Sequence, residues 1–110
     1  MFDPIYVINP NRNAAVTQGI DQAIDRFRLA GGPPIHCLTL FNGPNAVQSQ
    51  GDIASVTGPL GELAQKHDDT ASAFVIACFS DPGLALLREQ CRTPVLGIGE
   101  CAILQALEQG

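Results

Sequence analysis

Short apolar runs alternate along this chain with longer stretches in which apolar residues recur at helical spacing. The short runs are rich in β-branched and aromatic residues and end in Gly, Pro or Asn, a pattern that predicts strands. The predicted strands cover residues 5–8, 35–41, 73–77 and 95–96. Strands that alternate with helices indicate an α/β protein with a parallel sheet, right-handed crossovers and helices on both faces.

One helical stretch follows each predicted strand. The stretches cover residues 14–30, a less regular region from 53 to 64, residues 82–91 and residues 99–107. Asn13 is the expected N-cap of the first helix. Pro59 lies inside the second region, which predicts either a break just before it or a helix that begins there. Ser80, Asp81 and Pro82 are expected to supply the cap and the first-turn proline of the third helix.

The length and composition predict one small globular domain over residues 1–110. Apolar residues make up 45% of the 110 positions and charged residues 15%, which is ordinary for a folded protein. The formal charge of −5, with six scattered Lys and Arg, argues against nucleic-acid and anionic-membrane partners. There is no apolar run of about 20 residues and no signal-peptide pattern at the N-terminus, so we expect a cytoplasmic protein.

The cysteine and histidine pattern predicts free thiols and no metal site. The four cysteines are Cys37, Cys78, Cys91 and Cys101. No pair forms a CxxC motif, and the two histidines, His36 and His67, do not complete a zinc-ligand spacing. In a reducing compartment such thiols stay unpaired, so the question is whether any of them is chemically special.

Cys78 is the strongest candidate for chemistry. It ends the most convincing strand and precedes a predicted helix, and backbone N–H groups and the helix dipole at such a position favour a thiolate. Ligands of open α/β sheets bind at this carboxyl edge of the strands. The alternative is a buried cysteine that serves as a small apolar residue. Cys37 is expected in the core, and Cys91 and Cys101 are expected to pack.

Four segments resemble the hydantoin racemases and their allantoin racemase relatives. Residues 73–84, Ala-Phe-Val-Ile-Ala-Cys-Phe-Ser-Asp-Pro-Gly-Leu, look like the first-cysteine motif of that family. Residues 8–11, 43–44 and 94–100 resemble its other motifs, in the family's order and spacing. The resemblance extends over the whole chain.

The resemblance implies a single three-layer flavodoxin-like lobe with a four-stranded parallel sheet, which is half of the two-lobed aspartate/glutamate racemase fold. It implies that Cys78 is the catalytic thiol of the first lobe and that Asn9 and Asn11 line the cleft. Phe79 and Ser80 are expected to offer backbone N–H groups to a substrate oxygen. The implied activity is cofactor-independent racemisation next to a carbonyl of a small molecule, namely a hydantoin, allantoin or an amino-acid derivative, without pyridoxal or metal.

The resemblance also exposes a departure, because the family continues for another lobe that carries the second cysteine. We therefore expect a truncated product or fragment that is inactive alone, and whose exposed lobe-contact surface favours self-association. A homodimer would place two Cys78 thiols across one cleft. Two other classes stay open: a non-catalytic module that binds a small metabolite or anion, and another superfamily reaction such as that of a maleate isomerase or arylmalonate decarboxylase. A redox thiol protein is disfavoured by the lack of CxxC.

Overall fold

Strand β1 (Ile5–Asn9) lies inside a four-stranded parallel sheet. It pairs with β2 (Ile35–Thr39) on one side and with β3 (Ala73–Ile76) on the other, and β3 pairs with β4 (Val95–Gly97). The strand order is β2-β1-β3-β4 in the computed structural model, which describes residues 2–110. The predicted sheet is confirmed, although β2 and β3 end before residues 41 and 77.

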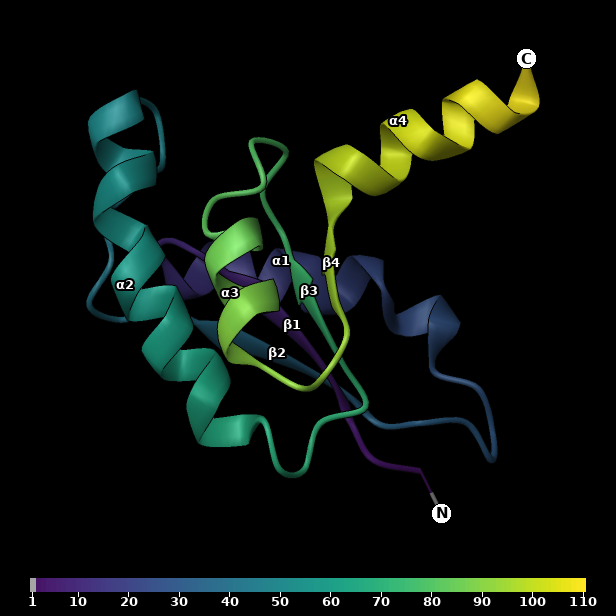
Figure 1. The fold of residues 1–110 in the computed structure, drawn as a ribbon. Helices are drawn as coiled ribbons and strands as arrows, with labels where there is room; N and C mark the ends of the chain where they lie inside the picture. Colours follow the sequence, from purple (N-terminus) through teal and green to yellow (C-terminus); the bar gives the residue numbers. More distant parts are fainter. Residues whose placement is uncertain (1) are drawn as a thin grey trace.

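Helices α1 (Ala14–Ala23), α2 (Gln50–His67) and α3 (Leu84–Gln90) form the outer layers of an α/β sandwich. Helix α4 (Ile98–Gln109) follows the last strand. Figure 1 shows α2 and α3 together on one side of the sheet and α1 on the other, which confirms the three-layer arrangement. Among residues 2–110, none of the helices has both the length and the apolar character that a bilayer crossing requires.

The main core lies between the sheet and the helix pair α2 and α3. Alternate strand residues point to this side, so Ile8, Phe74 and Ile76 are fully buried. The remaining buried members of the cluster come from the helices and from the flanking strand ends: Leu40, Val56, Leu60, Ala64, Leu87 and Val95. This packing makes β1 and β3 the rigid supports of the loops that follow them.

The opposite face of the sheet is covered over only part of its width. Helix α1 packs against β2 and β1, whereas Val75 and Ala77 of the β3 region line an apolar cavity of about 450 Å³ with Ile98. Helix α4 points away from the body (Figure 1), and its residues from Cys101 onward are all exposed. The expected helix cover on both faces is therefore incomplete on this side.

Helix α1 is shorter than the predicted stretch to residue 30, because Arg28 folds back onto it. The Arg28 guanidinium donates to the backbone oxygen of Asp21 at 3.1 Å and to that of Ile35 at 2.9 Å, and it pairs with the Asp21 carboxylate. These contacts hold a 3₁₀ turn (Asp25–Phe27) in place of further α-helix. The apolar period alone could not show this, since it continues through Phe27.

The break expected at Pro59 is absent, and α2 runs through the proline. A capping box between Ser49 and Asp52 fixes the helix start, and Leu60 and Ala64 bury its later turns against the sheet. Proline removes one backbone hydrogen bond, but tertiary packing on both sides of it holds the helix together. The helix therefore starts at Gln50, well before the expected position.

Helix α3 starts two residues later than predicted. It begins at Leu84 after Gly83, which has a left-handed backbone (φ 73°) and makes no side-chain cap. The side chains of Ser80 and Asp81 do not cap this helix, although the backbone oxygen of Asp81 accepts the Leu84 N–H at 3.3 Å; the Asp81 carboxylate is used elsewhere, as described below. Helix α3 therefore begins six residues after Cys78.

We predict that Asp68 makes folding stability depend on acid pH. Its carboxylate accepts hydrogen bonds from the backbone N–H groups of Arg92 (3.1 Å) and Thr93 (3.0 Å), and bonding to Thr93 and then Arg92 lowers the pKa of Asp68. Because the pKa of Asp68 is lower in the folded than in the unfolded protein, the carboxylate stabilises the fold at any pH above the unfolded value of about 3.9. This stabilisation is lost as the pH falls through the folded pKa. Asp68→Asn should thus reduce the free energy of unfolding at pH 7 by about 1 kcal/mol, and by less below pH 4.

Urea denaturation at pH 7 and at a pH below 4 measures how far the Asp68→Asn substitution lowers the free energy of unfolding. Asp69→Asn is the matched control, because Asp69 makes only an exposed ion pair with Arg92 and should change stability by less than about 0.5 kcal/mol. An equal loss for both variants, or a loss at Asp68 that does not shrink in acid, would contradict the assignment.

Candidate active site

The parallel pairing brings the loops after β1 and β3 next to each other. Ala77, directly after β3, donates its backbone N–H to the oxygen of Ile8 in β1 at 2.9 Å. Asn9 and Cys78 therefore leave neighbouring strands at the same edge of the sheet. This edge is where the sequence predicted a ligand site, since strand ends in such sheets present their loops together.

Cys78 opens a tight turn. The backbone N–H of Asp81 donates to the Cys78 oxygen at 2.9 Å, which closes a four-residue turn. The Cys78 sulfur is half-buried and lies 3.3 Å from the hydroxyl oxygen of Ser80. A hydroxyl at that distance can donate to a thiolate or accept from a thiol, so it can serve both protonation states.

Phe79 and Ser80 occupy the two central positions of this turn. Both are exposed, Phe79 with 64% of its surface in solvent. Within residues 2–110, their backbone N–H groups donate to no acceptor. The turn therefore presents two N–H donors beside a sulfur atom, which is the arrangement that stabilises negative charge on a nearby oxygen.

Asn9 is buried, and its side chain bonds both the loop after β1 and helix α1. Its amide nitrogen donates to the side-chain oxygens of Asn11 (2.9 Å) and Thr17 (3.0 Å) and to the Asn13 backbone oxygen (3.2 Å). Its own side-chain oxygen accepts from the Asn11 backbone N–H at 3.2 Å. Only 1% of Asn9 is exposed, so its position suits it to shaping the loop, with Asn11 nearer to solvent.

The loop after β2 packs onto the same edge. The backbone N–H of Arg12 donates to the oxygen of Pro44 at 2.9 Å, and the Arg12 side chain donates to Asn45 at 2.8 Å. Gly43 lies so close to the backbone oxygen of Pro10 that an added Cβ would be at 3.0 Å from it. The loops that follow β1, β2 and β3 (residues 10–13, 40–49 and 77–83) therefore lie together at one edge of the sheet, and we call this group of loops the ledge.

The start of α4, which follows β4 directly, is joined to the ledge through Asp81, a role that the sequence did not reveal. Its carboxylate accepts the backbone N–H groups of Gly99 (2.9 Å) and Glu100 (2.7 Å) at the start of α4. Asp81 was interpreted as a cap for the helix that follows it in sequence. The left-handed backbone of Asp81 (φ 50°) turns its side chain to a more distant helix, and the glycines at 97 and 99 were the only sequence hint of that close approach.

The other cysteines differ from Cys78 in their surroundings. Cys37 is half-buried on the α1 side of β2, and burial together with the charge of Asp21 raises the pKa of its thiol. Burial also raises the pKa of Cys91, which packs beside the core. Cys101 is exposed on α4. The raised pKa values keep Cys37 and Cys91 protonated, which does not suit them to nucleophilic or basic chemistry.

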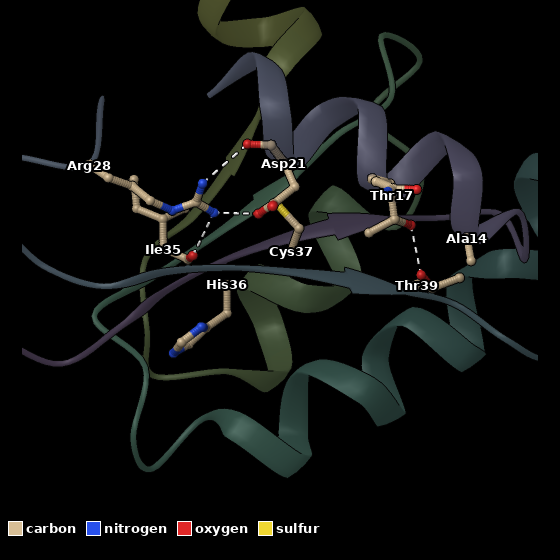
Figure 2. Close-up of a pocket in the computed structure, with 9 residues that line it drawn as sticks. Ala14, Thr17, Asp21, Arg28, Ile35, His36, Cys37 and Thr39 are labelled. Atoms are coloured by element: carbon tan, nitrogen blue, oxygen red, sulfur yellow. Dashed lines mark hydrogen bonds and ion pairs between the residues drawn. The ribbon is translucent and has the colours of Figure 1, made fainter. Parts of the chain in front are cut away.

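A separate cavity of about 610 Å³ lies between α1 and β2, where Asp21, Arg28 and Cys37 come together (Figure 2). The guanidinium of Arg28 donates hydrogen bonds to Asp21, to Asp25 and to the backbone oxygen of Ile35. These polar groups therefore satisfy one another, and Cys78 does not line this cavity. Across residues 2–110, no group of three or more His, Cys, Asp or Glu is arranged to hold a metal ion.

Comparison with known proteins shows one consistent likeness. The family model described as "Asp/Glu/Hydantoin racemase" matches residues 5–110. The hydantoin racemase of Paenarthrobacter aurescens is 36% identical over 101 residues, which is 90% of this chain and 42% of that protein. The hydantoin racemase of Pseudomonas sp. (strain NS671) is also 36% identical, over 93% of this chain and 41% of its own length.

A solved structure gives the same picture in three dimensions. The allantoin racemase from Klebsiella pneumoniae superposes with a TM-score of 0.86 at 33% identity, and the match covers 96% of this chain and 43% of that one. The chain thus spans less than half the length of the relatives that it matches.

We predict that Asn9 holds the ledge together. Asn9→Ala removes the buried amide that donates to three oxygens and the acceptor of the Asn11 N–H, so the free energy of unfolding should fall by about 1–3 kcal/mol in urea denaturation. Asn45→Ala removes an acceptor from an exposed hydrogen bond with Arg12 and should cost less than about 0.5 kcal/mol. Equal stability of the wild-type and Asn9→Ala proteins would show that the Asn9 network does not hold the loop.

Proposed function

Because the chain belongs to the Asp/Glu/hydantoin racemase family, we propose that it forms one lobe of a cofactor-independent racemase, with Cys78 as an acid–base thiol. The family assignment confirms the resemblance seen in the sequence motifs. The observation that carries the proposal is the turn at Cys78, where the half-buried thiol lies 3.3 Å from the Ser80 hydroxyl and where, within residues 2–110, the N–H groups of Phe79 and Ser80 have no acceptor. We place the protein in the cytoplasm, where reducing conditions keep such a thiol free.

The proposed reaction begins with removal of a proton from the carbon next to a carbonyl. The Cys78 thiolate takes the proton, so an S–H bond forms while the C–H bond breaks and its electron pair moves into the enolate oxygen. We propose that the N–H groups of Phe79 and Ser80 donate to that oxygen. A donor of this kind is typically worth about 3 kcal/mol in the transition state. Asn11, on the adjoining loop, would line the same cleft, with Asn9 beneath it.

We propose a small cyclic ureide as substrate, because the relatives are named as hydantoin and allantoin racemases. Such rings have an acidic C–H next to a carbonyl, and their oxygens accept hydrogen bonds. Return of the proton to the opposite face inverts the configuration and needs a second acid across the cleft. We propose that a second thiol supplies it, from a lobe equivalent to the part of the relatives that this chain does not span or from Cys78 of a second copy.

The prediction is that Cys78 alone exchanges the substrate proton without inverting the carbon. The chain is incubated in D₂O with one enantiomer of a 5-substituted hydantoin, deuterium at C5 is followed by NMR, and configuration is followed by circular dichroism. We expect deuterium to enter faster than in buffer and the configuration to be retained. The part of the exchange rate that exceeds the rate in buffer alone should fall by about 10²–10⁴-fold in Cys78→Ser, because this substitution removes the base.

Cys101→Ser is the matched control, because Cys101 is exposed on α4 and outside the turn, and it should leave the exchange rate unchanged. Exchange that persists in Cys78→Ser would remove Cys78 from the mechanism. Inversion by the chain alone would show that a second lobe is not required, and dependence of that inversion on protein concentration would assign the second thiol to another copy.

A further inference from the structure

Asp81 links the turn at Cys78 to a helix that begins seventeen residues further on in the chain. Its carboxylate receives the backbone N–H groups of Gly99 and Glu100 at 2.9 and 2.7 Å, and its own N–H closes the turn onto the Cys78 oxygen. The backbone of Asp81 therefore belongs to the turn at Cys78, which we call the thiol turn, while its side chain bonds the first turn of α4. Charged acceptors at a helix N-terminus form strong hydrogen bonds, so this link is a firm one.

The backbones on the two sides of this link are in direct contact. A Cβ at Gly99 would overlap the backbone oxygen of Phe79, and a Cβ at Gly97 would overlap the Asp81 carboxylate. The start of α4 thus lies against the peptide groups of the Cys78 turn with no side chain between them. Because only glycine permits that distance, a shift of the α4 start would displace the turn directly.

Ordinary helix capping does not account for this geometry. The residue in the N-cap position of α4 is Gly97, which offers no side-chain cap, and the cap comes instead from Asp81 in a different loop. To supply it, Asp81 adopts a left-handed backbone that is uncommon for a residue with a side chain. A cap drawn from the thiol turn fixes that turn as well as the helix.

We infer that Asp81 is a positioning residue, which holds the turn so that the Cys78 sulfur and the N–H groups of Phe79 and Ser80 keep their arrangement. The meaning of this arrangement for catalysis rests on the proposed function, whereas the link itself does not. Asp81 acts through the turn and has no contact with a reacting atom in this inference.

A matched control is available on the other side of α4. Arg88 of α3 donates to both carboxylate oxygens of Glu100, at 3.2 and 2.7 Å, and to the backbone oxygen of Val95 at 3.0 Å. It therefore fixes the same helix start as Asp81 but has no hydrogen bond to the Cys78 turn. Arg88→Gln loosens α4 while it leaves the Asp81 link in place.

The test compares Asp81→Asn, Asp81→Gly, Gly99→Ala and Arg88→Gln. Asn and Gly both tolerate the left-handed backbone and both remove the charge, but only Asn keeps an acceptor for one of the two N–H groups. Amide hydrogen exchange at residues 99 and 100, measured by NMR, reports the link. The rate at which iodoacetamide alkylates Cys78, resolved by peptide mass spectrometry and divided by the rate at which it alkylates free glutathione in the same sample, reports its effect on the thiol.

We expect Asp81→Gly to lose amide protection and to change the relative alkylation rate of Cys78 by at least about fivefold, because thiol reactivity follows its local surroundings. Gly99→Ala should act in the same direction, Asp81→Asn should stay within about twofold of wild type, and Arg88→Gln should leave the Cys78 ratio unchanged. Equal effects of Asp81→Asn and Asp81→Gly would attribute the change to charge and overturn the inference, as would unchanged protection in Asp81→Gly. A Cys78 that resists alkylation in every folded variant would instead contradict the proposed function, and amide exchange would still decide the link.

Discussion

The chemistry-bearing loops of this chain are placed by the parallel pairing of β1 with β2 on one side and with β3 on the other. Parallel strands end at the same edge, so segments that are some seventy residues apart in sequence, those at Asn9 and Cys78, start from adjacent strand ends. The apolar packing of Ile8, Phe74 and Ile76 fixes this pairing from below. Without that core, the strand ends that bring the Asn9 loop and the turn at Cys78 together would not be held side by side.

The two faces of the sheet are not equivalent. One carries the main core under α2 and α3, whereas on the other side α1 covers only part of the sheet and α4 extends into solvent (Figure 1). Large apolar side chains remain exposed along α4, including Ile103 and Leu107. Surfaces of this kind are typical of sites of contact with further protein. This is consistent with a chain that spans less than half the length of its relatives.

At the edge itself, two different devices hold the loops. The side chain of Asn9 bonds the loop after β1 and Thr17 of α1, and the Asp81 carboxylate bonds the start of α4. Both residues act on backbone geometry. The turn at Cys78 contains a sulfur with a hydroxyl neighbour and two N–H groups, the set that the proposed proton transfer uses. The rigid surroundings and the reactive group thus come from different residues.

The sequence by itself determined the four strands, their alternation with helices and the family, because apolar periodicity and the residues around a strand end are local properties. It also singled out Cys78, whose role stays a prediction. It could not set the end of α1, where Arg28 reaches back to Asp21 and forward to Ile35, or carry α2 through Pro59, where packing of Leu60 and Ala64 outweighs a missing hydrogen bond. It also assigned Asp81 to the wrong helix. Only the tertiary structure brings Gly99 against Phe79, since that contact depends on where β4 lies in the sheet, and sequence patterns carry no direct record of such long-range distances.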